Sequence, residues 1–314
     1  MKVALFIFLW IYNSKIELMI VAQLRGGLGN QMFQYAFAKN IAATNKTQLI
    51  LDTSYLQSKL PFKKWATPMQ YELKIFNIKA ALSTNFINSN LWLYPFAKAE
   101  YIVKELWKKK RFQFVQEKQF NFDETLFKSG DDSFLIGNFQ SESYFKNIAQ
   151  ELRNDFIFLP ELDNKNQEWM TEIKSKNSVS IHIRRGDYLS IAKNAQKFIS
   201  LPLEYYKNAI SKIAEQVANP VFYIFSDDVQ WVQQNLKLDF PTFFITNNHT
   251  PATAYIDMQL MSACKHHIIA NSTFSWWGAW LNPNSDKIVI APKQWFSDTT
   301  INSKDICPLE WIKL

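Results

Sequence analysis

Short apolar runs alternate with segments of helical spacing along most of the chain, and the second half shows this pattern most clearly. The expected strands there are 178–183, 221–225, 243–246, 267–270 and 287–290, and the expected helices are 203–217, 229–236, 252–263 and 273–281. Strands that alternate with helices in this way predict a parallel, doubly wound α/β sheet.

The first half begins with the same alternation. The apolar run 20–24 predicts a strand that leads into a glycine turn, and the spacing of apolar residues then predicts a helix over 30–44. The run 48–51 predicts a second strand, whereas 90–122 is aromatic and basic and gives no clear prediction. The polar segment 161–176 is expected to link the two halves.

The length of 314 residues is sufficient for two domains, which we expect over 19–160 and 161–314. The apolar run 3–12 resembles the core of a signal peptide, but no small-residue cleavage site follows it. We therefore expect residues 1–18 to be an upstream extension, with Met19 at the start of the first strand.

Composition and charge narrow the class of protein. Hydrophobic residues make up 47% of the chain and charged residues 20%, which is typical of a globular protein with a core. The net charge of +7 suits an anionic ligand such as a nucleotide diphosphate, a membrane surface or nucleic acid. No RNA-binding module is recognisable, so we expect no nucleic-acid partner. The two cysteines, Cys264 and Cys307, show neither a disulfide framework nor zinc spacing.

Compartment and membrane contact are predicted from the same features. No segment reaches the ~20 apolar residues that span a bilayer, and the low cysteine content suits a reducing cytoplasm. The basic, aromatic stretch 104–118 could lie on an anionic membrane that carries a lipid-linked acceptor. A solvated basic face explains the stretch equally well. We therefore expect a cytoplasmic protein, with peripheral association at the inner membrane face as an option.

The strand expected over 178–183 ends in an arginine-rich loop, His182-Ile183-Arg184-Arg185-Gly186-Asp187-Tyr188. Because side chains alternate along a strand, His182 and Arg184 point the same way. Gly186 permits a tight turn, and Asp187 can accept backbone or arginine hydrogen bonds. Open α/β sheets bind ligands at this end of a strand, and a guanidinium can grip diphosphate oxygens with two hydrogen bonds. Taken alone, the loop is also typical of a structural Arg–Asp pair.

Five segments in order resemble the bacterial α1,2-fucosyltransferases of glycosyltransferase family 11. The arginine-rich loop resembles the first motif shared by α1,2-, α1,6- and protein O-fucosyltransferases. The other segments are Gly26-Gly27-Leu28-Gly29-Asn30-Gln31-Met32-Phe33-Gln34-Tyr35, Gly137-Asn138-Phe139-Gln140-Ser141-Glu142-Ser143-Tyr144-Phe145, Phe225-Ser226-Asp227-Asp228 and Asn271-Ser272-Thr273-Phe274-Ser275-Trp276-Trp277-Gly278. The resemblance runs from about Met19 to the C-terminus.

This resemblance implies a GT-B-like α/β fold with two Rossmann-like domains facing a cleft, the donor in the C-terminal half and the acceptor mainly in the N-terminal half. It implies inverting transfer of L-fucose from GDP-β-L-fucose to a galactose hydroxyl in α1,2 linkage, without a metal or other cofactor. The expected partners are GDP-fucose and a galactose-containing glycan such as a bacterial polysaccharide or O-antigen. A fucosyltransferase of other linkage (α1,6) and a non-catalytic GDP- or sugar-binding protein remain as alternatives.

Arg184 is the expected catalytic cation. The chain has no Asp-x-Asp pair of the kind that holds a metal in other glycosyltransferases, so another group must neutralise the departing GDP. Negative charge grows on the β-phosphate as the glycosidic bond breaks, and a fixed guanidinium stabilises that transition state preferentially. The resemblance adds His182 as a nucleotide contact. Arg185, Asp187 and Asp227 are counted with the donor-binding residues, although structural roles are open for all three.

The glycine turn is expected to contribute Gly27, Gly29 and Asn30 to the donor side of the site. Its glycines let the backbone turn sharply into a helix whose N-terminus favours anions. Asn30 suits a helix N-cap, while the matching residue of the protein O-fucosyltransferases lies beside the reacting sugar. We expect Asn30 to have a catalytic or orienting role, which is compatible with capping.

The remaining donor-side candidates lie near the C-terminal half's later strands. Asn271, Ser272 and Thr273 occupy a strand–helix junction that can bind phosphate or serve for ordinary capping. Phe274 is counted with them, although its ring is more typical of packing. Asp257 matches the family acid thought to bind the guanine N1–H and N2 amine, with a solvated helix acid as the alternative. No catalytic base is identified, and a loose oxocarbenium-like path needs less base assistance.

Overall fold

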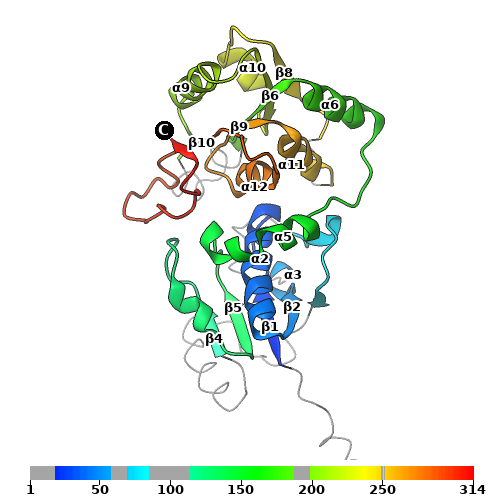
Figure 1. The fold of residues 1–314 in the computed structure, drawn as a ribbon, viewed down its shortest axis with the longest axis vertical. Coiled ribbons are helices and arrows are strands. Elements are labelled where there is room, and N and C mark those ends of the chain that lie inside the picture. Colours follow the sequence, from blue (N-terminus) through cyan, green and yellow to red (C-terminus); the bar gives the residue numbers. More distant parts are fainter. Residues whose placement is uncertain (1–17, 58–68, 85–112, 187–198, 249, 251) are drawn as a thin grey trace, which may run out of the picture.

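The computed structural model describes residues 18–57, 69–84, 113–186, 199–248, 250 and 252–314. Their strands form two separate parallel sheets, one in each half of the chain (Figure 1). The first sheet has the order β3-β2-β1-β5-β4 and the second has the order β11-β10-β9-β6-β7-β8. Two parallel sheets with helices alongside confirm the expected α/β class.

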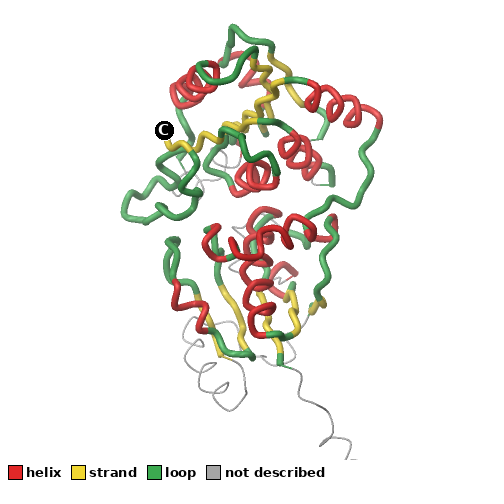
Figure 2. The backbone as a smooth tube through the Cα atoms, in the orientation of Figure 1, coloured by secondary structure: helices red, strands yellow, loops and turns green. Residues whose placement is uncertain are grey.

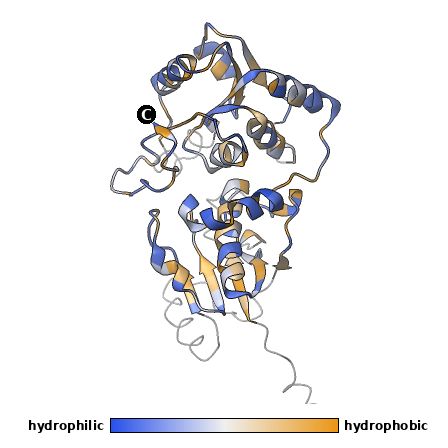
Figure 3. Cartoon of the chain, viewed as in Figure 1, coloured by the Kyte–Doolittle hydropathy of each residue, from blue (hydrophilic) through white to orange (hydrophobic). Residues whose placement is uncertain are grey.

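The first sheet consists of β1 (Met19–Gln23), β2 (Gln48–Asp52), β3 (Ala81–Ser83), β4 (Gln113–Gln116) and β5 (Ser133–Ile136). The second consists of β6 (Asn177–Ile183), β7 (Pro220–Ser226), β8 (Thr242–Ile245), β9 (His266–Ile268), β10 (Val289–Ala291) and β11 (Ile312–Lys313). Apolar residues colour most of β1 and β5 orange in Figure 3. The strands expected in both halves are therefore present, with ends shifted by one or two residues.

The helices are α2 (Leu28–Asn45), α3 (Ser54–Gln57), α5 (Ala149–Asp155), α6 (Asn164–Ser175), α9 (Leu203–Ala214), α10 (Val229–Asn235), α11 (Ala254–Ala263) and α12 (Thr273–Leu281). Short 3-10 helices lie at η2 (Leu73–Ile75), η3 (Glu124–Lys128), η4 (Glu142–Tyr144) and η5 (Lys146–Ile148). Figure 2 shows how these helices and the loops between them surround the two sheets.

Helices cover both faces of the second sheet. Phe222 and Ile224 of β7 pack in one core with α9 and α10, whereas Tyr223 and Phe225 pack in another core with α6 and α11. A strand that is buried on both faces needs apolar residues at successive positions, which is why β7 reads as a nearly continuous apolar run. This is the doubly wound arrangement that the sequence predicted.

The prediction of a linker over 161–176 is wrong for most of that range, because 164–175 forms the helix α6. Asp163 caps this helix by accepting a hydrogen bond from the backbone N–H of Asn166 at 2.9 Å. Only Asn166 and Ile173 of the helix are buried, so its sequence is polar enough to resemble a linker. Helix α6 packs against α11 and β6 and thus belongs to the second sheet's half.

The two halves meet where α2 lies against α12 (Figure 1). The ring of Phe33 on α2 lies 4.5 Å from that of Trp276 and 4.9 Å from that of Trp277 on α12. The Trp277 indole N–H donates to the backbone carbonyl of Gly29 at 2.9 Å, and that of Trp280 donates to Glu142 at 2.8 Å. The tryptophans of the fifth motif are therefore packing residues, and one continuous apolar core joins the halves.

Candidate functional site

Three polar segments follow neighbouring strands of the second sheet. β6 lies between β7 and β9, and it pairs with both in parallel. The arginine-rich loop follows β6, Asp227 and Asp228 follow β7, and the 271–273 junction follows β9. Because the carboxyl ends of parallel strands meet at one edge of a sheet, the fold brings these segments together. This is the edge at which open α/β sheets bind ligands.

Arg184 is held by an acid from the neighbouring strand. Its Nη1 lies 3.1 Å from Oδ2 of Asp227, and both side chains are partly exposed. The other oxygen of Asp227 accepts the backbone N–H of Arg185 at 2.8 Å. Gly186 lies so close that a Cβ there would be 3.0 Å from the same carboxylate. One carboxylate thus fixes both the loop and the Arg184 guanidinium, while part of that guanidinium stays accessible to a ligand.

Arg185 is directed to a different place, as strand alternation predicts. Its guanidinium carbon lies 3.3 Å from the ring centroid of Trp231, and its Nε lies 3.4 Å from Oδ2 of Asp228. Asp228 also caps α10 by accepting the backbone N–H of Trp231 at 3.3 Å. These contacts attach the arginine-rich loop to α10 and describe a structural role. A donor contact by Arg185 stays a prediction.

His182 is a buried imidazole with an unused polar atom. It lies beside the ring of Phe274, with centroids 5.8 Å apart, on the face of β6 opposite Ile181 and Ile183. Burial and the neighbouring Arg184 charge lower the pKa of His182 to about 4, so the ring is neutral near pH 7. Its buried Nδ1 has no hydrogen-bond partner among the described residues. A buried polar atom without a hydrogen bond costs free energy unless a ligand or a water molecule supplies the missing partner.

The junction after β9 is built differently from the expectation. The Asn271 amide donates to the backbone carbonyls of Ile199 and Trp295, at 2.9 Å each. Asn271 is only 1% exposed, so its amide holds the loop in place rather than donating these hydrogens to a sugar nucleotide. Ser272 precedes α12 as its N-cap residue without a side-chain cap bond, and Thr273 begins the helix. Ser272 and Thr273 therefore remain the residues of this junction best placed for an anion.

The glycine turn brings the N-termini of α2 and α12 together. Gly26 has φ 73°, which favours glycine, and a Cβ on Gly29 would lie 2.7 Å from the backbone carbonyl of Thr273. The alternative in which Asn30 is the N-cap does not hold, because Gly27 is the N-cap and Asn30 lies in the first turn. Glu72 instead accepts the N–H of Leu28 at 3.0 Å.

Asn30 is held by the mid-chain segment. Its side-chain oxygen accepts a hydrogen bond from the Gln140 amide at 2.8 Å. Glu117 supports this segment by accepting the backbone N–H groups of Asn138 and Phe139 at 2.7 and 2.9 Å. Burial raises the pKa of Glu117 to about 7, and the two backbone hydrogen bonds oppose that shift. The Gln140 hydrogen bond fixes the orientation of the Asn30 side chain, and the catalytic or orienting role of Asn30 stays a prediction.

Asp257 lies in the first turn of α11 and is 8% exposed. Its Oδ1 accepts a hydrogen bond from the Asn248 amide at 2.8 Å, just beyond β8. Burial raises the pKa of Asp257 to about 7, and the Asn248 hydrogen bond opposes the rise. The structure thus excludes the alternative of a solvated helix acid.

Several of these partners carried no signal in the sequence. Glu72, Gln140 and Asn248 were not predicted, and each makes its contact through a loop or an irregular segment. Gln140 lies within a segment that resembled the family, which was the one available hint. The other two are ordinary polar residues that only the folded chain brings to the site.

Two predicted features fall outside the described part of the chain. Asp187 lies there, as do residues 104–112 of the basic stretch, so the role of Asp187 and membrane association stay predictions. Across the described ranges, no three His, Cys, Asp or Glu side chains form a group that could hold a metal ion. None of the helices in those ranges is long and apolar enough to cross a membrane.

The remaining histidines of the described C-terminal half serve the fold. His267 is fully buried, and its ring nitrogens lie 2.8 Å from Ser180 Oγ and from the Asn282 amide. His266 accepts the backbone N–H of Ile288 at 3.0 Å. The contacts of both rings lie within the second sheet and its supports, in agreement with the structural role expected for them.

The sequence matches the model of glycosyl transferase family 11 over residues 1–314. It is 36% identical over 311 residues to an alpha-1,2-colitosyltransferase of Escherichia coli, covering 94% of this chain and 98% of that one. It is also 35% identical to the O-antigen biosynthesis glycosyltransferase WbnK of Escherichia coli, with 93% and 99% coverage. The human galactoside alpha-(1,2)-fucosyltransferase 1 is 24% identical over 148 residues, or 45% of this chain and 40% of that one.

Solved structures show the same architecture. The alpha-1,6-fucosyltransferase NodZ of Bradyrhizobium, soaked with GDP-fucose, has a TM-score of 0.50 at 16% identity, over 85% of this chain and 93% of that one. A mutant of Arabidopsis thaliana FUT1 in complex with GDP also has a TM-score of 0.50, at 11% identity, over 92% and 74%. These similarities confirm the GT-B-like fold that the sequence predicted.

Proposed function

The chain belongs to glycosyl transferase family 11, and on that basis we propose that it is an inverting galactoside α-1,2-fucosyltransferase. The proposed reaction moves L-fucose from GDP-β-L-fucose to a galactose hydroxyl of a glycan. The observation that carries the proposal is Arg184, held by Asp227 at the carboxyl end of the central strand β6.

Arg184 supplies the charge that the proposed reaction needs. When the bond between fucose and GDP breaks, negative charge develops on the β-phosphate. A guanidinium already fixed by Asp227 meets that charge without having to be ordered during the reaction. Neutral His182, with its unpartnered Nδ1, is suited to a hydrogen bond with the same GDP-fucose molecule. The role of the metal in other glycosyltransferases falls to Arg184, so the proposed enzyme works without one.

Asp257 supports a guanine nucleotide as the donor. The guanine edge offers two parallel donors, N1–H and the N2 amine, and a carboxylate accepts both. Asp257 contacts Asn248 in the loop after β8, and β8 lies two strands from β6, a separation of about 10 Å at the usual strand spacing. A nucleoside diphosphate can bridge that distance with its phosphates at Arg184.

A second donor is favoured by one relative. The alpha-1,2-colitosyltransferase of Escherichia coli transfers colitose, a sugar that differs from fucose by the absence of the 3-hydroxyl group. The linkage is the same, and the contacts of Arg184 and Asp257 would serve either GDP-sugar. Competition between GDP-fucose and GDP-colitose for one acceptor separates these two candidates.

The reaction is tested with GDP-fucose and a panel of acceptors that carry a terminal galactose. We expect GDP release with lactose-type acceptors at the same rate in EDTA and in Mn²⁺, and a product whose NMR spectrum shows fucose α1,2-linked to galactose. An α1,6 product would contradict the proposed linkage. Strict dependence on Mn²⁺ would contradict the role given to Arg184.

Donor affinity is expected to fall by roughly tenfold between pH 8 and pH 6, because the guanine donors require Asp257 as a carboxylate. Its raised pKa of about 7 places the loss of charge within that interval, and affinity decreases as the pH falls. Calorimetry with GDP-fucose measures this without interference, since its diphosphate is a diester and has no ionisation in the interval. Asp257→Asn should bind weakly with little pH dependence, and an unchanged slope in that variant would contradict the assignment.

A further inference from the structure

Asp257 stands at one end of a chain of buried polar side chains that the proposed reaction does not itself require. Asn248 donates to Oδ1 of Asp257 at 2.8 Å, and Asn248 and Asn166 exchange two amide hydrogen bonds of 3.0 Å each. Asn166 then donates to the carboxylate of Asp163 at 3.1 Å. This series of hydrogen bonds runs from the start of α6, through the loop after β8, to the first turn of α11.

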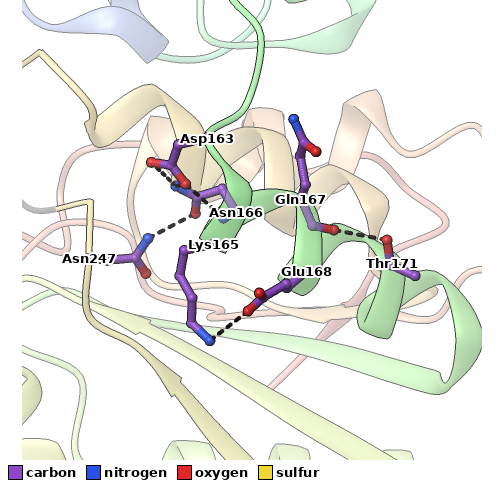
Figure 4. A network of polar contacts seen from close by, with 7 residues as sticks. All are labelled: Asp163, Lys165, Asn166, Gln167, Glu168, Thr171 and Asn247. Atoms are coloured by element: carbon purple, nitrogen blue, oxygen red, sulfur yellow. Dashed lines mark hydrogen bonds and ion pairs between the residues drawn. The ribbon is translucent and has the colours of Figure 1, made fainter.

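The two central amides are almost fully buried and fully used. Asn166 is 0% exposed and Asn248 is 1% exposed. One amide hydrogen of each goes to the other asparagine, and the second goes to an aspartate. Asn247 adds a hydrogen bond of 3.1 Å to the Asn166 oxygen, and Figure 4 shows it together with the Asp163 contact. Reciprocal bonds of this kind fix which way each amide faces.

This arrangement determines which part of Asp257 is available. Oδ1 is bound by Asn248, whereas Oδ2 has no hydrogen-bond partner among the described residues. A carboxylate oxygen can accept two hydrogen bonds, so Oδ1 keeps one position and Oδ2 keeps both. A carboxylate held at one corner cannot rotate freely, and its open side presents two adjacent acceptors. Two adjacent acceptors match the two parallel donors of guanine.

We propose that Asn166 and Asn248 are positioning residues, which hold Asp257 in the orientation that accepts the two hydrogen-bond donors of guanine. Selectivity for the base would then depend on α6, although the residues of α6 need not touch the nucleotide. The inference rests on the proposed function, because it takes a guanine nucleotide as the ligand of Asp257. It adds that the selectivity between purines is set by this amide pair rather than by Asp257 alone.

The test compares dissociation constants for GDP, IDP and ADP, measured by calorimetry on the full chain. IDP lacks the N2 amine, and ADP lacks both guanine donors. We expect the unaltered protein to prefer GDP over IDP by about tenfold, the scale of one hydrogen bond to a charged group. Asn166→Ala should reduce that preference at least threefold, with ADP affinity changed less than twofold because the phosphate contacts remain intact.

Two further variants complete the comparison. Glu168→Ala lies on the same helix with an exposed side chain that pairs with Lys165, so its preference for GDP should be unchanged (Figure 4). Asn166→Ser keeps a hydroxyl but cannot make both amide bonds, so it replaces Asn166→Ala if that variant fails to fold. We expect the same loss of preference from it.

Each remaining result has one meaning. A lower melting temperature with an unchanged GDP-to-IDP ratio in the Asn166 variants would overturn the positioning role and leave the proposed function standing, provided that Asp257→Ala abolishes the preference. Equal binding of GDP, IDP and ADP by the unaltered protein would overturn both the positioning role and the proposed function, because the protein would then not select a guanine base at all.

Discussion

Replacing Arg184 with lysine is expected to lower turnover by about 10²–10³-fold, even though the positive charge is retained. A planar guanidinium can donate to Asp227 and to a phosphate oxygen at the same time, in fixed directions. An ammonium group is a point charge on a flexible stem and cannot keep both partners in place. Because the interaction strengthens as charge leaves with GDP, we expect the loss mainly in kcat rather than in KM.

Arg185→Lys is the matched control, since it changes the neighbouring residue in the same way. Arg185 stacks on Trp231 and lies beside Asp228, so its replacement should weaken the attachment of the loop to α10 and reduce turnover far less. Steady-state kinetics on both variants with GDP-fucose and lactose provides the measurement. Near-normal turnover of Arg184→Lys, or equal losses in the two variants, would refute the role given to Arg184.

Gly29→Ala is expected to reduce the free energy of unfolding by about 1–3 kcal/mol, the usual effect of overpacking, and to lower activity at the same time. The added Cβ would lie 2.7 Å from the carbonyl carbon, carbonyl oxygen and Oγ1 of Thr273. Backbone atoms of two helix termini cannot yield as the end of a flexible side chain would. The two helix termini must therefore move apart slightly, which strains the Trp277 hydrogen bond to the Gly29 carbonyl.

Gly27→Ala supplies the control two residues earlier in the same turn. The nearest atoms to a Cβ at that position are 3.8 and 3.9 Å away, and its φ of −81° suits alanine. We expect a cost below about 1 kcal/mol, arising from the poorer helix cap alone. Chemical denaturation of both variants gives the free energies, and comparable losses would show that contact across the two helices is not what matters at Gly29.

The strands of the second half could be predicted because their sequences leave few alternatives. β7 is a nearly continuous apolar run that ends in polar residues, and β6 combines alternating apolar positions at Val179, Ile181 and Ile183 with an arginine pair directly after it. The order of the strands could not be predicted, yet that order places Arg184 beside Asp227, 43 positions further along the chain. Spacing along the sequence does not indicate which strands are neighbours, so the sequence predicts Arg184 and Asp227 only as two separate candidates.

The errors have equally specific causes. Helix α6 resembles a linker in sequence because its buried side is narrow and one of its two buried residues is the polar Asn166. The alternative of Asn30 as the cap of α2 rests only on the frequency of asparagine at caps. The cap position falls on Gly27 instead, and the N–H that needed a partner found it in Glu72, a residue 44 positions further along. A cap supplied from so far away leaves no local pattern.

The carboxylate of Glu72 lies at the start of α2 and changes the electrostatic potential of that helix end. The beginning of a helix carries partial positive charge, which is why nucleotide-binding folds so often place phosphates there. In the first half that position already contains an acid of the protein's own, bound to the N–H of Leu28. A phosphate at that position would compete with the Glu72 carboxylate, which weighs against the predicted donor contacts of Gly27 and Gly29. The proposed function accordingly places the pyrophosphate at Arg184, beside the second sheet. Under the proposed function, the start of α2 is therefore better suited to the uncharged acceptor sugar than to a phosphate.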